Sequence, residues 1–147
     1  MSLSDNLKFI GNEIDKLLSE QLVITEELEA GLIVAMRYAS IGSGKKVRPY
    51  LVYASSNIFG VPLKQAIMVG AAVEMVHTYS LIHDDLPCMD NDDIRRGKPS
   101  LHKKFNESTA MLAGNSLLIK AFKILAGNEV HNDLDVRVRL ISELAEV

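Results

Sequence analysis

The chain has 147 residues, of which 48% are hydrophobic and 24% are charged, and its net charge at neutral pH is −3. This length and composition suit one domain with a hydrophobic core and exclude an intrinsically disordered chain. The slight negative charge, with basic residues only in local groups, excludes the basic surface that nucleic-acid-binding proteins present.

Apolar residues recur with the period of an α-helix along nearly the whole chain. The first such pattern runs from Leu7 to Gln21, with Ser4 as its expected N-cap. The second runs from Leu28 to Ala39, opens at the acidic pair Glu26-Glu27 and closes near Gly42. Two amphipathic helices are therefore expected before residue 43.

Proline, glycine and asparagine mark the later boundaries. Pro49 falls in the first turn of a third helix, where its missing N–H is harmless, and Gly60 would end that helix. A long fourth helix would run from Pro62 to about Asp85. The remaining expected boundaries are Asn106 or Glu107 for the start of a fifth helix, Gly127 for its end and Asn132 for the cap of a sixth. No segment alternates with period two, so we expect one all-α domain over residues 1–147.

The cysteine count and the lengths of the apolar runs indicate in which cellular compartment the protein is expected. Cys88 is the single cysteine, so an intramolecular disulfide and a cysteine metal cage are excluded and a reducing cytoplasm is expected. The polar N-terminus lacks the pattern of a signal peptide. No apolar run approaches the roughly 18 residues of a membrane span, so a membrane protein is not expected.

An acidic run stands at the end of the fourth expected helix. Five of the ten residues from Asp84 to Asp93 are aspartates, and Arg95 and Arg96 follow. Clustered carboxylates repel one another, and oxygen ligands without a Cys or His run favour Mg²⁺. Because arginine binds phosphate through paired hydrogen bonds, the carboxylates, a metal and the arginines together indicate a diphosphate site.

The spacing inside this run predicts a break in the helix. Asp84 and Asp90 are six residues apart, so a regular helix would point them roughly 120° from one another. Pro87 cannot donate to the carbonyl of His83, and the helix should end or bulge there. An acidic helix end with a solvated loop is the plain alternative, although the helix dipole disfavours acidic residues at that end.

Four segments resemble, in order and spacing, motifs of the trans-prenyltransferase (polyprenyl synthetase) family. The acidic run resembles its first aspartate-rich motif, and residues 43–49 resemble its Gly-Gly-Lys-Arg-x-Arg-Pro element, with Ser43 in place of Gly and Lys46 in place of Arg. Residues 73–83 and 110–115 resemble the helices before and after the aspartates. Asn115 stands where family members often carry Asp.

The resemblance spans roughly Ile33 to Val147 and is nearest to the bacterial farnesyl diphosphate synthases (geranyltranstransferases) of the family. It implies a helical bundle of the isoprenoid synthase type. Family members are typically about twice this long, so the chain is expected to be the N-terminal half of such a bundle. The expected assembly is a homodimer.

The resemblance also implies a reaction and its residues. The reaction is the Mg²⁺-dependent head-to-tail condensation of an allylic diphosphate, dimethylallyl or geranyl, with isopentenyl diphosphate to give farnesyl diphosphate. Asp84, Asp85 and Asp90 would hold the metal, and Arg95 the allylic diphosphate. The residues implied for isopentenyl diphosphate are Lys45, Arg48, His77 and Arg96. Without the resemblance each has a plainer interpretation: charge balance for the arginines, an ordinary loop for the glycine-rich stretch, a core residue for the histidine.

Tyr79 bears on product length. It precedes Asp84 by five residues, roughly 7.5 Å along a helix, where a bulky side chain would block a growing hydrocarbon tail. An ordinary core aromatic is the alternative. In having an aromatic at this position the chain resembles the farnesyl diphosphate synthases. The residue sequence at positions 88–93 instead resembles that of geranylgeranyl diphosphate synthases, so a geranylgeranyl diphosphate synthase remains an alternative.

Two other classes of function stay open. One is a non-catalytic remnant or subunit of a prenyltransferase, because no second aspartate-rich segment is present and the sequence stops at Val147 within an expected helix. The other is an acidic helical module that binds only Mg²⁺ or Ca²⁺, against which the basic pairs Lys45–Arg48 and Arg95–Arg96 argue. We expect the 147-residue chain alone to be inactive.

Overall fold

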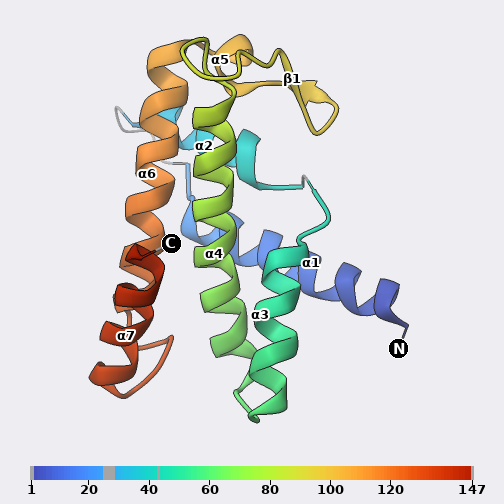
Figure 1. Ribbon diagram of the computed structural model, residues 1–147, viewed down its shortest axis with the longest axis vertical. Coiled ribbons are helices and arrows are strands. Elements are labelled where there is room, and N and C mark those ends of the chain that lie inside the picture. The colour runs from blue at the N-terminus through green and yellow to red at the C-terminus, as the bar shows by residue number, and fades with distance from the viewer. Residues whose placement is uncertain (1, 25–28, 43, 147) are drawn as a thin grey trace.

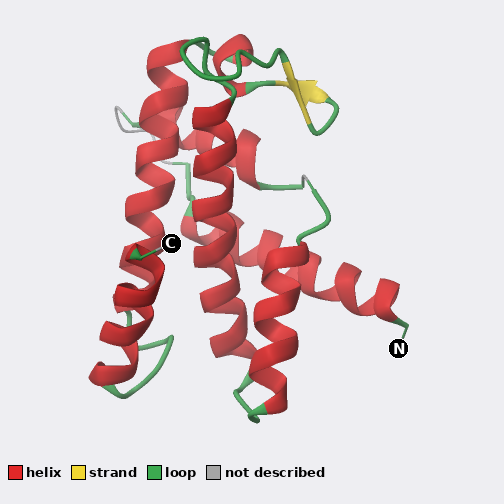
Figure 2. Cartoon of the chain, in the orientation of Figure 1, coloured by secondary structure: helices red, strands yellow, loops and turns green. Residues whose placement is uncertain are grey.

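The computed structural model describes residues 2–24, 29–42 and 44–146, which form seven helices and one short hairpin (Figures 1 and 2). The elements in chain order are α1 Leu3–Gln21, α2 Ala30–Ser40, α3 Val47–Ile58, α4 Leu63–Asp84, β1 Ile94–Arg95, β2 Lys98–Pro99, α5 Leu101–Lys104, α6 Glu107–Ala126 and α7 Leu134–Ala145. The long helices α4 and α6 lie side by side and run in opposite directions, and α3 packs along the other side of α4 (Figure 1). The all-α class is confirmed, and α4 is its central helix.

Helix α1 begins earlier than the sequence indicated. Ser2, not Ser4, is the N-cap: its side chain accepts from the backbone N–H of Asp5, whose carboxylate accepts in return from the N–H of Ser2. This reciprocal pair satisfies two donors at the helix start. The predicted apolar stripe is confirmed, with fully buried side chains at Ile10, Ile14 and Leu18, each stabilising the fold by about 1.5–3 kcal/mol.

Helix α2 is joined to the end of α1 by one arginine. The guanidinium of Arg37 donates to the carbonyl of Leu22 at 2.7 Å and to that of Ser19 at 3.1 Å. It therefore satisfies carbonyls that the end of α1 leaves without a helical partner. The opening expected at residues 26–28 and the substituted Ser43 lie outside the described residues.

Helix α4 is bounded nearly as predicted. Pro62 is its N-cap, and Pro49 and Gly60, at φ +70°, mark the first turn and the end of α3. At the other end Leu86, not Pro87, donates to the carbonyl of His83, at 3.2 Å. The predicted break is thus confirmed. Because Pro87 has no N–H to donate, the carbonyl of His83 accepts from Leu86 in a tighter, three-residue turn.

Two boundaries and one small element differ from the prediction. Asp133, not Asn132, caps α7, while Asn106 caps α6 as predicted. The hairpin of β1 and β2, with the pairs Ile94↔Pro99 and Arg95↔Lys98, was not predicted. Its two turn residues, Arg96 and Gly97, both have positive φ (53° and 76°), which is the type I′ geometry that matches strand twist.

Helix α6 corrects one expectation. By length and composition alone its residues 107–126 suffice to cross a membrane, and less than half of its most apolar stretch is buried inside the molecule. The helix packs against α4, α2, α5 and α7, and it carries Lys120 and Lys123. One such segment is weak evidence for a membrane span.

Candidate active site at the end of helix α4

The acidic run forms a closed loop directly after α4. The N–H of Asp90 donates to the carbonyl of Asp84 at 2.8 Å, and the N–H of Asn91 donates to that of Leu86 at 3.1 Å. Asp84 is half-buried, Asp85 is buried and Asp90 is exposed. The loop therefore brings the two ends of the motif together through its backbone, across the six-residue spacing.

Asp85 is the partner of Arg95. The Nε of Arg95 donates to both carboxylate oxygens of Asp85, at 2.9 and 3.2 Å, and its Nη2 also reaches Asp92 at 3.0 Å. These contacts raise the pKa of the Arg95 guanidinium, chiefly through the hydrogen bond to Asp85. A buried carboxylate is tolerated because this paired geometry satisfies it.

The three aspartates suit a hard cation by the chemistry of their donors, which are all oxygen. Among the residues that the structure describes, however, no group of three or more Asp, Glu, His or Cys side chains lies close enough to share a metal ion. Asp85 is occupied by Arg95 in this arrangement. The metal site on Asp84, Asp85 and Asp90 therefore stays a prediction.

A second polar group lies further back along α4. The Nη1 of Arg48, at the start of α3, lies 3.3 Å from the Nε2 of His77 on α4. Burial first, and then the nearby charges of Arg48, Arg96 and Lys46, lower the pKa of His77, while Glu74 acts in the opposite direction. Three of the four residues predicted for isopentenyl diphosphate thus share one electrostatic neighbourhood.

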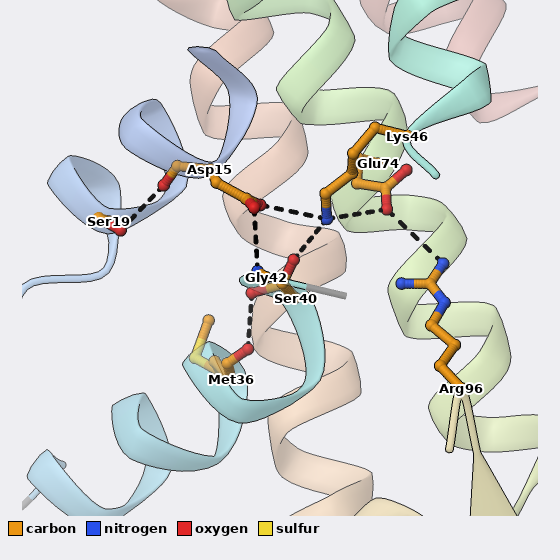
Figure 3. A network of polar contacts seen from close by, with 8 residues as sticks. All are labelled: Asp15, Ser19, Met36, Ser40, Gly42, Lys46, Glu74 and Arg96. Atoms are coloured by element: carbon orange, nitrogen blue, oxygen red, sulfur yellow. Dashed lines mark hydrogen bonds and ion pairs between the residues drawn. The ribbon is translucent and has the colours of Figure 1, made fainter. Parts of the chain in front are cut away.

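Behind this group is a buried ion network that the sequence did not reveal (Figure 3). The carboxylate of Glu74 is 2% exposed and pairs with Lys46 at 3.2 Å and with Arg96 at 3.6 Å. The ammonium of Lys46 also donates to the carbonyl of Ser40 at 2.6 Å and lies 3.4 Å from Asp15 on α1. The network joins α1, α4, the loop before α3 and the hairpin.

Arg96 packs directly against the glycine-rich loop. A Cβ added to Gly44, whose φ is +74°, would lie 2.7 Å from the Cζ of Arg96, closer than side chains approach. Glycine is therefore needed at residue 44 for its backbone conformation and for this contact. Lys45 follows it and is exposed, lining a separate groove of about 890 Å³ beside α1.

A small cavity borders both arginines, Arg95 and Arg96. It measures about 40 Å³, and Asp85, Arg95, Arg96 and Thr78 are among its lining residues. The Thr78 hydroxyl is buried without a hydrogen-bond partner in the described part of the chain. Glu74, Lys46 and Thr78 were all missed, because charge spacing along one helix does not show which polar residues a neighbouring segment will cover.

Tyr79 lies beside the contact between α4 and α6. Its ring meets that of His83 edge-on, at 4.6 Å between centroids, and the Nε2 of His83 lies 3.2 Å from the carbonyl of Met111. Gly114 on α6 lets the two helices approach at this level. His83 thus has a structural role in the contact between α4 and α6, and Tyr79 stands one helical turn before it.

Comparison with known proteins gives the family. The sequence profile described as "Polyprenyl synthetase" matches residues 30–147. The chain is 47% identical over 146 residues to the farnesyl diphosphate synthase of Bacillus subtilis (97% of this chain, 47% of that protein). It is 44% identical over 135 residues to the chloroplastic geranylgeranyl pyrophosphate synthase of Catharanthus roseus (92% of this chain, 37% of that protein).

Solved structures agree with this result. The apo structure of an FPP/GFPP synthase from Zymomonas mobilis has a TM-score of 0.93 and 48% identity, over 97% of this chain and 53% of that one. A geranyltranstransferase from Thermotoga maritima has a TM-score of 0.81 and 34% identity, over 95% and 49% of the two chains. The chain thus spans between about a third and a half of the length of the relatives it matches. With this fold and these motifs, the protein belongs to the polyprenyl synthetase family, near its bacterial farnesyl diphosphate synthases.

Proposed function

We propose that this chain supplies the diphosphate-binding half of a farnesyl-type prenyl diphosphate synthase. The observation that carries the proposal is the divergence of two adjacent arginines. Arg95 turns to Asp85 and Arg96 turns to Glu74, two carboxylates whose positions on α4 differ by roughly 16 Å of helical rise. Two substrates that each carry a diphosphate repel one another, so they need separate cationic groups.

The allylic diphosphate is assigned to the loop after α4. Arg95 would donate to the oxygens of the leaving diphosphate, and Asp84, Asp85 and Asp90 would hold Mg²⁺. When bound there, the metal would neutralise the negative charge that develops on the diphosphate as the allylic C–O bond breaks. Without the metal, Asp85 pairs with Arg95 through the contacts described above, so Mg²⁺ would take the place of Arg95 on this carboxylate.

Isopentenyl diphosphate is assigned to the second polar group, through Arg48, His77 and Arg96, with Lys45 from the adjacent loop. The allylic C–O bond would break first, and the double bond of isopentenyl diphosphate would then form the new C–C bond. The proton lost from the adduct would pass to the departing pyrophosphate. Most of the rate acceleration would come from charged groups that bind the two diphosphates and orient the reacting carbons.

The remaining parts of the proposal concern the product, the oligomeric state and the localisation. Tyr79 favours farnesyl over geranylgeranyl diphosphate, although relatives named for both products match at 44–47% identity. We further propose a homodimer that is cytoplasmic and not membrane-embedded, and that the 147-residue chain alone does not turn over substrate. A non-catalytic family member is the second candidate.

Calorimetry on residues 1–147 tests the assignment. A non-hydrolysable allylic diphosphate analogue and Mg²⁺ should bind together far more tightly than either does alone, because each offsets the other's charge. Asp84→Ala and Asp90→Ala should abolish this synergy. The control is Glu129→Gln, which changes an exposed ion pair at the far end of α4. Equal synergy in both aspartate variants would overturn the proposal.

A further inference from the structure

We propose that Glu74 is a positioning residue for the isopentenyl diphosphate subsite, which it builds by holding Arg96 against the loop at Gly44. The inference rests on the proposed function of Arg96, but the feature itself is structural. One carboxylate, 2% exposed, is shared by two cations from segments that are far apart in the chain. Its removal would leave both cations without their common partner.

The two cations of this network have different roles. Lys46 is fully enclosed, with its side chain 3% exposed, and its ammonium already has Ser40 and Asp15 as partners. It therefore serves to fix the loop that precedes α3. Arg96 keeps 20% of its side chain exposed while it is paired to Glu74, so it is the less enclosed of the two cations and the one assigned to the diphosphate.

The backbone of Arg96 strengthens this interpretation. A non-glycine residue at φ 53° is strained, and the hairpin turn imposes that conformation on Arg96. The turn aims the side chain back toward α4, where Glu74 and Gly44 enclose the guanidinium on two sides. An arginine that is bound and packed in this way loses little conformational freedom when it takes up a diphosphate.

Two substitutions disturb Arg96 by independent routes. Glu74→Gln keeps the size of the side chain and removes the charge, so Arg96 and Lys46 lose their shared anion. Gly44→Ala changes no charge, but its Cβ would meet the guanidinium of Arg96 at 2.7 Å and displace it. Arg96 and the loop packed against it are what the two variants disturb in common.

The test is calorimetric titration of residues 1–147 with isopentenyl diphosphate, without Mg²⁺, together with the side-chain Nε–H NMR signal of Arg96. Both variants should bind roughly tenfold more weakly and should shift and broaden that signal. Glu74→Asp should recover part of the affinity. Glu129→Gln, the same change at an exposed carboxylate, should leave binding and signal unchanged.

The outcomes separate the two proposals. If the unsubstituted chain binds no isopentenyl diphosphate, the proposed function of this subsite fails. If it binds, and Glu74→Gln and Gly44→Ala bind equally well, the positioning role fails. Should Glu74→Gln not fold, as its thermal transition would reveal, the Gly44→Ala variant decides: normal affinity there overturns the inference, and a tenfold loss with a displaced Arg96 signal upholds it.

Discussion

The ring of His83 lies over Gly114 so closely that a methyl group on residue 114 would be 2.5 Å from its Nε2. This contact fixes the separation of α4 and α6 at the level of the proposed site, because no side chain stands between the histidine and the opposite helix. His83 also contacts Tyr79 and the carbonyl of Met111, so its displacement would disturb the aromatic side chain proposed to limit product length.

Gly114→Ala should therefore destabilise the fold. Alanine improves helix propensity by about 1 kcal/mol, but forcing a Cβ into the His83 ring costs about 1–3 kcal/mol and breaks the contact with Met111. Urea denaturation should show a net loss. Gly31→Ala is the matched control, since nothing lies within 4 Å of a Cβ there, and it should be neutral or slightly stabilising. Equal effects of the two substitutions would contradict the packing argument.

Asp85 and Asp92 both pair with Arg95, but they should contribute differently to the free energy of unfolding. Asp85 is buried with a paired contact, so Asp85→Asn should lower the free energy of unfolding by about 1.5–3 kcal/mol. Asp92 is 52% exposed, and Asp92→Asn should cost less than about 0.5 kcal/mol. Chemical denaturation of the two variants in parallel measures the difference, and an equal loss from both would show that burial does not decide it.

His77 should make stability depend on pH. Its pKa in the folded chain is lowered from 6.5, mainly by burial and then by Arg48, so the unfolded chain binds more protons just below that pH. The free energy of unfolding should therefore fall as the pH falls from about 6.5 through the folded-state pKa, and be unaffected by His77 above this window. Denaturation between about pH 7.5 and 5 should show a flatter profile for His77→Gln. An unchanged slope would refute this assignment.

Tyr79→Ala should lengthen the product in a full-length family protein that contains residues 1–147. Removal of the ring opens the path of the hydrocarbon tail beyond the length of a farnesyl chain. Chromatography of the dephosphorylated products would show the shift. If the product distribution stays the same, Tyr79 is a packing partner of His83 and does not limit the chain.

The 147-residue chain should self-associate through an apolar face of α6. Met111, Leu112 and Ile119 are 48%, 56% and 69% exposed, and α6 offers them on one side. At about 25 cal/mol per Å², a few hundred Å² of such surface favours association by several kcal/mol. Sedimentation velocity should show a mass that rises with concentration, and Ile119→Lys should reduce it. A monomer at all concentrations would exclude this prediction.

The parts of the fold that depend on local chemistry were predictable. A missing N–H at Pro87 and a side-chain cap at Asn106 act on neighbouring backbone groups, so the sequence alone places the ends of α4 and α6. The error at Ser4 has the same local character, because Ser2 offers an equal hydroxyl and gains a reciprocal bond with Asp5. Such alternatives differ by about 1 kcal/mol, which is within the range of a single cap.

The parts that depend on distant segments were not predictable. Lys45 and Lys46 are adjacent and chemically alike, yet only Lys46 is buried, where it pairs with the carboxylate of Glu74. Glu74 comes 28 residues later, on α4, so the sequence around the two lysines does not show which of them is buried. A glutamate in a helical pattern is ordinarily expected to face solvent. The hairpin of Arg96 and Gly97 was missed for a related reason, since strands of two residues give no alternating pattern.

The backbone bond between Asp90 and Asp84 has a consequence for how the acidic loop would take up a cation. Ordering one residue costs about 1–2 kcal/mol of conformational entropy, and here folding has already met that cost for most of residues 84–91. A cation arriving at this loop would have to reorient carboxylate side chains and displace Arg95 from Asp85, but it would not have to order the backbone. The entropic cost of capture should therefore be nearly independent of chain length on either side, unlike that of a coil that must wrap around its ion.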